Sequence, residues 1–147
     1  MNDLKILKVD NTDLLGCCLA IRNTVFIEEK QVSREIEVDR YDCLNKKCAH
    51  FLIQYGEKDV GAVRCLNISE NTVKVQRFCI LKEYRNLGFG KTAMEYIENY
   101  YKKRGKTEII LDAKFSVCGF YEKYGYDKIS DVFTEAGVPH VKMIKNI

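Results

Sequence analysis

The sequence predicts an α/β (α+β) fold in which a mixed central sheet has helices on both faces. Strand-like segments come first along the chain, and a strand–helix–strand–helix–strand succession follows them. Residues 73–81 and 108–113 have strand character, and the amphipathic stretch between them, 88–104, has helical spacing. Such a unit forms a right-handed parallel crossover. The strand-like segments amount to about six or seven strands.

The N-terminal segment predicts one strand and one helix. Residues 4–9 alternate between apolar and polar side chains, as in a half-buried strand. Asn11 or Thr12 can cap a helix whose apolar residues form one stripe as far as Val25. The charged segment 26–42 is irregular, and we expect a second short helix followed by a loop there.

Turn-forming residues bound the remaining elements. Gly56 and Asp59 delimit a turn between two β-rich runs, which predicts a hairpin. Gly125 ends a brief helix, and residues 134–140 connect the last two strands. The expected ranges are strands at 49–55 and 60–68, a helix at 120–124, and strands at 126–132 and 141–144.

Length and composition indicate one globular domain over residues 1–147. The chain is 46% hydrophobic and 31% charged, as in ordinary soluble proteins. Its formal net charge of +3 is too small to indicate nucleic-acid binding. No apolar stretch approaches the ~18 residues of a membrane span, and the N-terminus lacks the apolar segment of a signal peptide. We therefore expect neither a nucleic acid nor a membrane as a partner.

The seven cysteines predict free thiols in a reducing compartment, the cytoplasm. Their number is odd, no C-x-x-C pair occurs, and several fall at predicted core positions, where a free cysteine behaves as a small hydrophobic residue. A metal site is not expected, because His50 and His140 are the only histidines and neither lies near a cysteine pair at ligand spacing. His50, at the edge of an apolar strand, is expected to be structural.

A glycine-rich loop links the strand at 73–81 to the helix that follows. Gly88 and Gly90 allow backbone N–H groups to approach a ligand closely, and a helix N-terminus favours an anion. Two basic side chains at the ends of the loop add positive charge. These features predict a phosphate-binding loop, whereas a tight strand-to-helix turn is the alternative for an isolated match. The loop consists of Arg85, Asn86, Leu87, Gly88, Phe89, Gly90 and Lys91.

The spacing argues against two common phosphate loops. A Walker A loop requires a glycine five residues before the Gly90-Lys91-Thr92 triplet, where the sequence has Arg85. The dinucleotide fingerprint matches weakly. Ala93 stands at its third small position, but no acidic residue ends a second parallel strand about 20 residues further on.

Two motifs in the expected order resemble the GNAT superfamily of acetyl-CoA-dependent N-acetyltransferases. The loop fits the pattern R/Q-x-x-G-x-G/A, and residues 118–126 (CGFYEKYGY) are similar to the F-Y-E-K-x-G-F/Y signature. Together they span residues 73–126 with family-like spacing. The N-terminal motif at residues 22–31 and the closing motif at 133–143 look like the bacterial ElaA-like branch, so the resemblance covers nearly the whole chain.

The resemblance implies where acetyl-CoA binds. The backbone around Phe78, Cys79 and Ile80 aligns the acetyl-pantetheine arm as an added strand, and the amides of residues 85–91 hold the pyrophosphate. Splaying between the strands at 73–81 and 108–113 leaves the slot for this arm. Lys114 stands where relatives usually have Asn or Gln, which puts one polar contact to the arm in doubt.

Amide formation from a thioester requires a neutral amine, an oxyanion donor and a proton for the departing thiolate. The resemblance places the Tyr121 hydroxyl near the cofactor sulfur, with a core aromatic as the alternative role. The backbone N–H near Cys79 or Ile80 can donate a hydrogen bond to the oxyanion.

The general base is a separate question, because Lys74 stands where some family members have a catalytic glutamate. His140, in a context similar to glyphosate N-acetyltransferase, is therefore the candidate base, and a structural histidine is the alternative. Phe120 is expected in the core.

Several side chains are candidates for contact with the acceptor substrate. One of Gln76 and Arg77 is expected to face the sheet surface where the substrate rests, and Arg22 can reach it from the first helix. An internal ion pair of an arginine with Glu29 or Glu37 is an equal alternative. The acidic segment 28–42 can line an entrance for a cationic amine or remain a solvated loop. The substrate-binding candidates are Arg22, Phe26, Gln76, Arg77 and His140.

The sequence thus predicts an enzyme that acetylates a primary amine of a small molecule by direct attack. A catalytically silent CoA-binding module of the same fold is the main alternative, and a P-loop nucleotide-binding protein is a weaker one. A ping-pong mechanism through Cys79 or Cys118 is disfavoured, because neither has a histidine nearby in sequence. The resemblance is also compatible with a homodimer.

Overall fold

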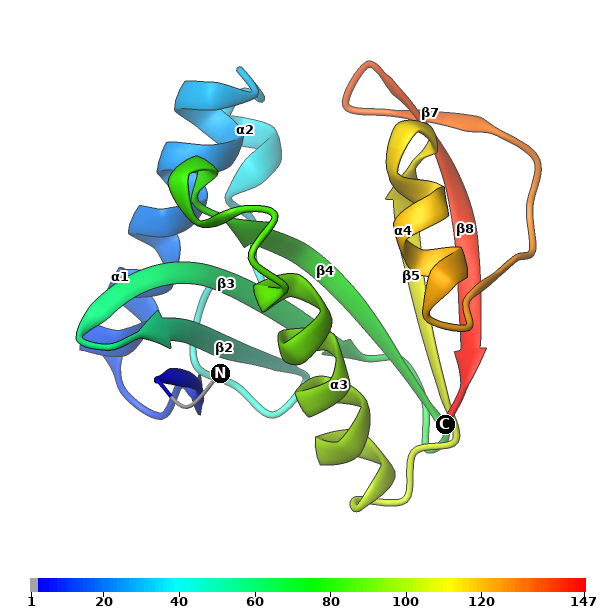
Figure 1. Cartoon of the computed structure of the whole chain (residues 1–147), viewed down its shortest axis with the longest axis horizontal. Helices are drawn as coiled ribbons and strands as arrows, with labels where there is room; N and C mark the ends of the chain where they lie inside the picture. Colours follow the sequence, from blue (N-terminus) through cyan, green and yellow to red (C-terminus); the bar gives the residue numbers. More distant parts are fainter. Residues whose placement is uncertain (1–2) are drawn as a thin grey trace.

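The computed structural model describes residues 3–147 and contains an eight-stranded mixed sheet with helices on both faces (Figure 1). The predicted fold class is confirmed. The strands are β1 Leu4–Lys8, β2 Cys48–Tyr55, β3 Lys58–Asn67, β4 Thr72–Ile80, β5 Glu108–Lys114, β6 Asp127–Lys128, β7 Phe133–Glu135 and β8 Val138–Asn146. The helices are α1 Thr12–Arg22, α2 Arg34–Glu37, α3 Phe89–Lys102 and α4 Cys118–Lys123, with a π-helical segment η1 Asn23–Glu29 and 3₁₀ turns η2 Lys82–Tyr84 and η3 Phe115–Val117.

The strand order is β1-β2-β3-β4-β5-β8-β6, and β7 pairs with β8. Among the strands of residues 3–147, only β4 and β5 run parallel, and α3 connects them, as the sequence predicts. Every other neighbouring pair is antiparallel. Within residues 3–147 no helix is long and apolar enough to cross a membrane.

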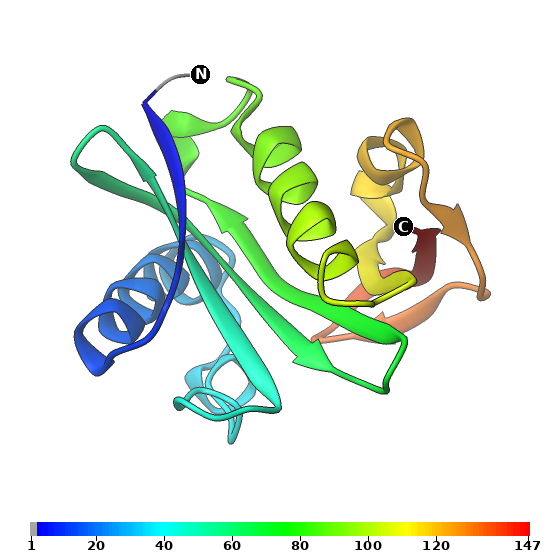
Figure 2. The same cartoon turned by 90° about the horizontal axis from the view of Figure 1, so that it is seen from below.

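The helices divide between the two faces of the sheet (Figure 2). On one face, Met94 and Ile97 of α3 and Cys118 of α4 pack into the largest hydrophobic cluster. On the other face, Leu15 and Cys18 of α1 pack against Leu52, Ala62 and Cys79. Burial of these apolar side chains is the main source of stability.

Local signals explain where helices begin. The Asn11 side chain accepts a hydrogen bond from the Leu14 N–H at 2.9 Å, which confirms it as the cap of α1. Beyond Arg22 the helix continues as η1 to Glu29, further than the sequence predicts. Gly88 adopts a left-handed conformation (φ 82°) directly before α3 and turns the chain from the loop into the helix.

Strands β4 and β5 pair only at their N-terminal ends. The parallel register runs from Thr72–Glu108 to Val75–Leu111 and stops there. Beyond this point the two strands diverge visibly (Figure 1). A β-bulge accompanies the divergence: Val63 of β3 lies opposite two residues of β4, Arg77 and Phe78, and Arg77 has a positive φ of 52°. The splay expected from the resemblance is therefore present.

The C-terminal strands differ from the prediction. A continuous strand over 126–132 is wrong, because β6 has only two residues. A loop over 134–140 is also wrong, since β7 and β8 form a tight hairpin there. Its two turn residues, Ala136 and Gly137, both have positive φ (50° and 75°), as in a type I′ turn. Alanine is uncommon at such a position, so the sequence gives little sign of this turn.

Candidate functional site

The glycine-rich loop presents a row of unpaired amides at the N-terminus of α3. Asn86 and Gly88 have positive φ values of 64° and 82°. Among residues 3–147, no backbone or side-chain acceptor is found for the N–H groups of residues 86–91, whereas the next amide, that of Thr92, donates to the Gly88 carbonyl at 3.2 Å. Free amides at a helix N-terminus are the usual binding site for a phosphate group.

Arg85 fixes this loop to its surroundings through its side chain. Its two terminal nitrogens donate to the Glu29 carboxylate at 2.7 Å each, and its Nε donates to the Ile80 carbonyl at 2.9 Å. These hydrogen bonds from Arg85 lower the pKa of Glu29 to about 2. The charge of Arg85 is thus already paired, and Lys91 is the more exposed cation of the loop.

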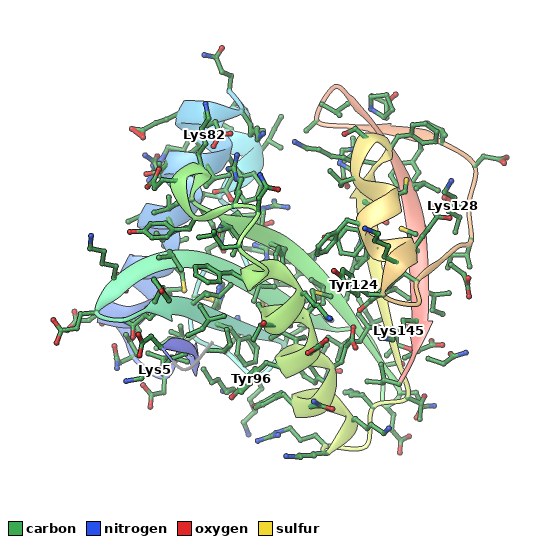
Figure 3. The ribbon with its side chains drawn as sticks, viewed as in Figure 1. Lys5, Lys82, Tyr96, Tyr124, Lys128 and Lys145 are labelled. Carbon is green, nitrogen blue, oxygen red and sulfur yellow. The ribbon has the colours of Figure 1, made fainter. Side chains whose placement is uncertain are left out.

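The loop lies close to α4. A Cβ atom built on Gly90 would lie 3.4 Å from the Phe120 ring and 3.8 Å from the Phe78 ring. The Lys91 ammonium lies 5.6 Å from the centre of the Tyr124 ring, a residue seen between α3 and α4 in Figure 3. Phe120, expected in the core, is 36% exposed, so that expectation is wrong. The one sequence feature that could have indicated a position beside the loop for Phe120 is its place in the F-Y-E-K-x-G-F/Y signature.

Tyr121 lies beside the same region. Its ring packs edge-on against Tyr126 at 5.7 Å and against Phe120 at 5.2 Å. Burial raises the pKa of Tyr121 to about 12. The phenol is therefore protonated at neutral pH and can donate a proton or a hydrogen bond.

His140 is buried on β8 with a defined hydrogen bond. Its Nδ1 lies 2.7 Å from the Val138 carbonyl oxygen, which can only accept. In the neutral ring, Nδ1 therefore carries the proton and Nε2 keeps its lone pair, as a general base requires. Nε2 lies 3.7 Å from the Glu135 carboxylate, and His140 pairs with Lys114 of β5 in register. His50, by contrast, is buried with its Nε2 3.0 Å from the Tyr41 carbonyl.

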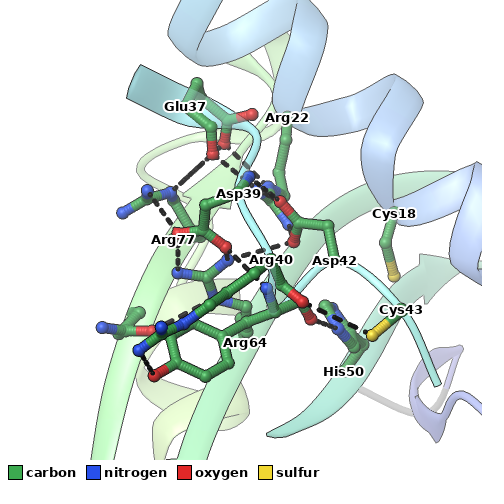
Figure 4. Close-up of polar contacts among 12 residues, drawn as sticks. Cys18, Arg22, Glu37, Asp39, Arg40, Asp42, Cys43, His50, Arg64 and Arg77 are labelled. Carbon is green, nitrogen blue, oxygen red and sulfur yellow. Dashed lines mark hydrogen bonds and ion pairs between the residues drawn. The ribbon is translucent and has the colours of Figure 1, made fainter. Parts of the chain in front are cut away.

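Arg22 lies in a buried ionic network (Figure 4). Its Nε donates to Glu37 at 2.8 Å, and its terminal nitrogens donate to Asp42 at 2.6 and 3.0 Å. The side chain is 1% exposed, so the structure realises the internal ion pair with Glu37 rather than an open substrate contact.

Arg64 completes the same network and was missed by sequence analysis. It contacts the Asp39 carboxylate at 2.7 Å and that of Asp42 at 3.1 Å. Although burial alone would raise it, hydrogen bonds from Arg22 and the Asp39 amide lower the pKa of Asp42 to about 2. Glu37, Asp39 and Asp42 therefore serve arginines of the fold and do not form an open acidic entrance. The spacing of these three acidic residues along the chain does not indicate which arginines they contact.

Gln76 and Arg77 both reach the face that carries this network. The Gln76 oxygen accepts from Arg64 Nε at 3.1 Å, and Arg77 Nε donates to the Glu37 carbonyl at 3.1 Å. The expectation that only one of them faces this side is wrong, because the bulge at Arg77 inserts an extra residue and interrupts the alternation. Phe26 is half-buried on η1.

The cysteines near the site are poor nucleophiles. Burial raises the pKa of the Cys79 thiol to about 12, so it stays protonated. The Cys118 sulfur lies 3.1 Å from the Phe115 carbonyl oxygen, as a thiol donor would. Among residues 3–147, no group of three or more His, Cys, Asp or Glu side chains is placed to hold a metal ion.

Comparison with known proteins places this geometry in a family. A family model described as "Acetyltransferase (GNAT) domain" matches residues 22–147. The Bacillus subtilis protein YyaT is 42% identical over 129 residues, which cover 88% of this chain and 86% of YyaT.

Solved structures show the same fold. A putative N-acetyltransferase from Lactobacillus plantarum superposes with a TM-score of 0.91 at 25% identity and covers 99% of each chain. Escherichia coli ElaA superposes with a TM-score of 0.81 at 22% identity and covers 97% of each chain.

Proposed function

The chain belongs to the GNAT acetyltransferase family, and from this premise we propose that it is an acetyl-CoA-dependent N-acetyltransferase. In this proposal residues 1–147 form one catalytic domain in the cytoplasm, and the acceptor is a primary amine of a small molecule. The seven free cysteines support a reducing compartment. A homodimer stays a prediction from the resemblance.

The free amides of residues 86–91 are the observation that carries the proposal. They suit a pyrophosphate, because six unpaired N–H donors lie in the first turn of α3 and directly before it. We assign the same loop, from Arg85 to Lys91, to pyrophosphate binding, with Arg85 acting through its contacts to Glu29 and Ile80. The divergence of β4 from β5 then leaves the backbone of Phe78, Cys79 and Ile80 to align the pantetheine arm, with Lys114 beside it.

His140 is assigned the role of base. An ammonium with a pKa near 10.4 is neutral in only about one part in 2,500 at pH 7, which corresponds to ~4.6 kcal/mol. Accepting this proton at Nε2, directly or through water, removes that cost and contributes ~10²–10⁴ in rate. The free lone pair at Nε2 and the Nδ1 hydrogen bond to Val138 support this assignment.

Tyr121 is assigned the role of proton donor to the departing thiolate. Acetyl-CoA supplies the acetyl group as a thioester, and the amine nitrogen attacks its carbonyl carbon directly. The N–H of Cys79 or Ile80 donates to the carbonyl oxygen as negative charge develops on it. The protonated thiol of Cys79 supports direct attack in a ternary complex rather than an acyl-enzyme.

A silent CoA-binding module is the second candidate. The specific observation in its favour is that Lys74, which replaces the catalytic glutamate of some relatives, forms an ion pair with Asp112 at 2.8 Å.

Two measurements separate an enzyme from a binding module. Calorimetry with CoA tests binding, and release of free thiol from acetyl-CoA tests turnover on a panel of primary amines. We expect both binding and amine-dependent thiol release. Binding without release on any amine would instead support the silent module, and absence of binding would contradict both.

A further inference from the structure

One face of strands β4, β5 and β8 carries a group of polar side chains, of which only His140 and Lys114 have a role in the function proposed above. We call it the polar face and define it by Lys74, Asp112, Lys114, His140 and Lys142. Cross-strand pairing puts Asp112 opposite Lys142 and Lys114 opposite His140, so these side chains share one side of the sheet. Their apolar neighbours Leu111, Ala113 and Met143 face the α3–α4 core instead. Helix α1 covers β2, β3 and β4 on the polar side, whereas α4 packs on the opposite side of β5 (Figure 2).

Asp112 has an incomplete set of hydrogen bonds. Its side chain is only 10% exposed, and its Oδ2 pairs with the Lys74 ammonium at 2.8 Å. Its Oδ1 is buried and has no hydrogen-bond partner among residues 3–147. Leaving a buried carboxylate oxygen without a donor is costly. The position therefore favours a ligand that brings an N–H donor.

The location of Asp112 matches the expected reaction centre. The last paired residues of the parallel strands are Val75 and Leu111, so Asp112 is the first residue of β5 beyond the point where β4 leaves. The bulge residue Arg77 follows Val75 by two positions on β4. A group held by Asp112 thus sits at the narrow end of the divergence into which the pantetheine arm would point.

Two cations flank Asp112. Lys142 lies directly across from it on β8, and Lys114 lies two residues further along β5 on the same side. Within residues 3–147 neither lysine forms an ion pair, and both are half-buried. Burial lowers the pKa of Lys114, and the nearby charges of Lys30 and Arg85 lower it further against an opposing effect of Glu29. An anion bound here would relieve this accumulation of positive charge.

We propose that the polar face is the acceptor site and that the acceptor is a zwitterion, a primary amine that also carries a carboxylate or phosphate group. The ammonium binds the carboxylate of Asp112, whose side chain is 10% exposed, and the anionic group binds Lys142 and Lys114. The bound ammonium then gives one proton to the base, His140, and the neutral amine attacks. This inference rests on the proposed acetyl transfer. It disfavours polyamines, because three lysines oppose one aspartate on this face.

The first test compares binding of matched amines to the CoA-loaded protein by calorimetry. Tyramine and tyrosine differ by a carboxylate, glucosamine and glucosamine 6-phosphate differ by a phosphate, and spermidine represents polycations. We expect the anionic member of at least one pair to bind at least 10-fold more tightly than its partner. Equal binding within both pairs, or tighter binding of spermidine, would overturn the inference. Since binding is measured, this result does not depend on turnover.

The second test changes the two ends of the site. Asp112→Asn should raise the KM for the preferred amine at least 10-fold, and Lys142→Gln should abolish the preference for the anionic member of its pair. The KM for acetyl-CoA should stay within 2-fold of wild type in both. Glu108→Gln is the matched control, because Glu108 lies on the same side of β5 but bonds to Thr72 at the far end.

Lys114→Gln separates two roles for that lysine. A weaker preference for the anionic amine supports the site proposed here, whereas a change confined to the KM for acetyl-CoA would remove Lys114 from it. Unchanged amine KM values in both Asp112→Asn and Lys142→Gln would overturn the inference even if the wild type acetylates amines. Absence of any acetyl transfer by the wild type would instead count against the proposed function alone.

Discussion

Tyr121 combines a half-buried ring with a hydroxyl that stays protonated, since desolvation raises its pKa to about 12. If this hydroxyl protonates the departing thiolate, Tyr121→Phe should lower kcat on the order of 10²-fold. The dissociation constant for CoA should change less than 3-fold, because the ring and its packing remain. Steady-state kinetics with a thiol reagent measure the first quantity and calorimetry the second.

Tyr124→Phe provides the matched control for this variant. Tyr124 lies on the same stretch of chain, and its ring contacts Phe120 and Lys91, which the phenylalanine preserves. Its kcat should remain near that of wild type. Full activity of Tyr121→Phe, or an equal loss in both variants, would contradict the assigned role.

The two histidines offer a paired comparison. His140→Gln removes the free lone pair of Nε2, so we expect kcat to fall ~10²–10⁴-fold and the limb of the pH–rate profile that reports the base to disappear. His50→Gln should retain most of the activity, because the His50 ring hydrogen-bonds with the Tyr41 carbonyl and, within residues 3–147, contacts no residue assigned to catalysis. An active His140→Gln enzyme with an unchanged pH profile would exclude His140 as the base.

Asp42 makes the ionic network sensitive to acid. Its pKa is about 2 in the folded protein and near 3.9 in an unfolded chain, so its contribution to stability is complete above about pH 4 and is lost as the pH falls toward 2. Asp42→Asn leaves Arg22 and Arg64 without their shared carboxylate. We expect a loss of about 3–5 kcal/mol in unfolding free energy at pH 7, and a smaller difference below pH 4.

Urea denaturation at pH 7, 5 and 3 measures this effect. Asp127→Asn, at an exposed position on β6, is the control and should match wild type throughout. A difference between Asp42→Asn and wild type that stays constant from pH 7 to pH 3 would contradict the linkage.

At the scale of elements, β4 depends on a glycine in the neighbouring strand. A Cβ on Gly61 would lie 2.6 Å from the Cys79 carbonyl oxygen and 2.8 Å from Ile80 Cδ1. Because the first of these is a backbone atom, β4 must shift where it would align the pantetheine arm. We expect Gly61→Ala to destabilise the fold by about 1–3 kcal/mol and to weaken CoA binding.

Gly16 of α1 provides the opposite case. A Cβ there meets nothing within 4 Å, so Gly16→Ala should stabilise by about 0.5–1 kcal/mol through helix propensity and leave CoA binding unchanged. Thermal denaturation and calorimetry measure both variants. A Gly61→Ala protein with wild-type stability and affinity would show that β4 adapts without cost.

Elements were predictable where periodicity and caps were clear. The stripe of α3, the Asn11 cap and the hairpin of β2 and β3 all follow from local sequence. The bulge at Arg77 and the turn at Ala136 did not, because a positive φ at a non-glycine residue depends on tertiary contacts rather than on propensity. The bulge mattered most, since it turns Gln76 and Arg77 to the same side.

At the scale of the whole molecule, the parallel crossover and the two motifs were sufficient to predict the fold class and the glycine-rich loop, but not the C-terminal strands of the sheet. The ionic network was not, because it joins residues of α1, the 37–42 segment, β3 and β4 that no local pattern relates. Three arginines and three carboxylates there balance in charge. The network therefore fixes the 37–42 segment to the sheet and leaves substrate recognition to other groups.

The free amides at the start of α3 are expected to bind the pyrophosphate of CoA, and calorimetric titration with CoA measures this binding. We expect clear binding by the wild type, at least 10-fold weaker binding of pantetheine, which lacks the pyrophosphate, and a similar loss in the Gly88→Val, Gly90→Val double variant. Equal affinity of the wild type for CoA and pantetheine, or full CoA affinity in the double variant, would contradict it.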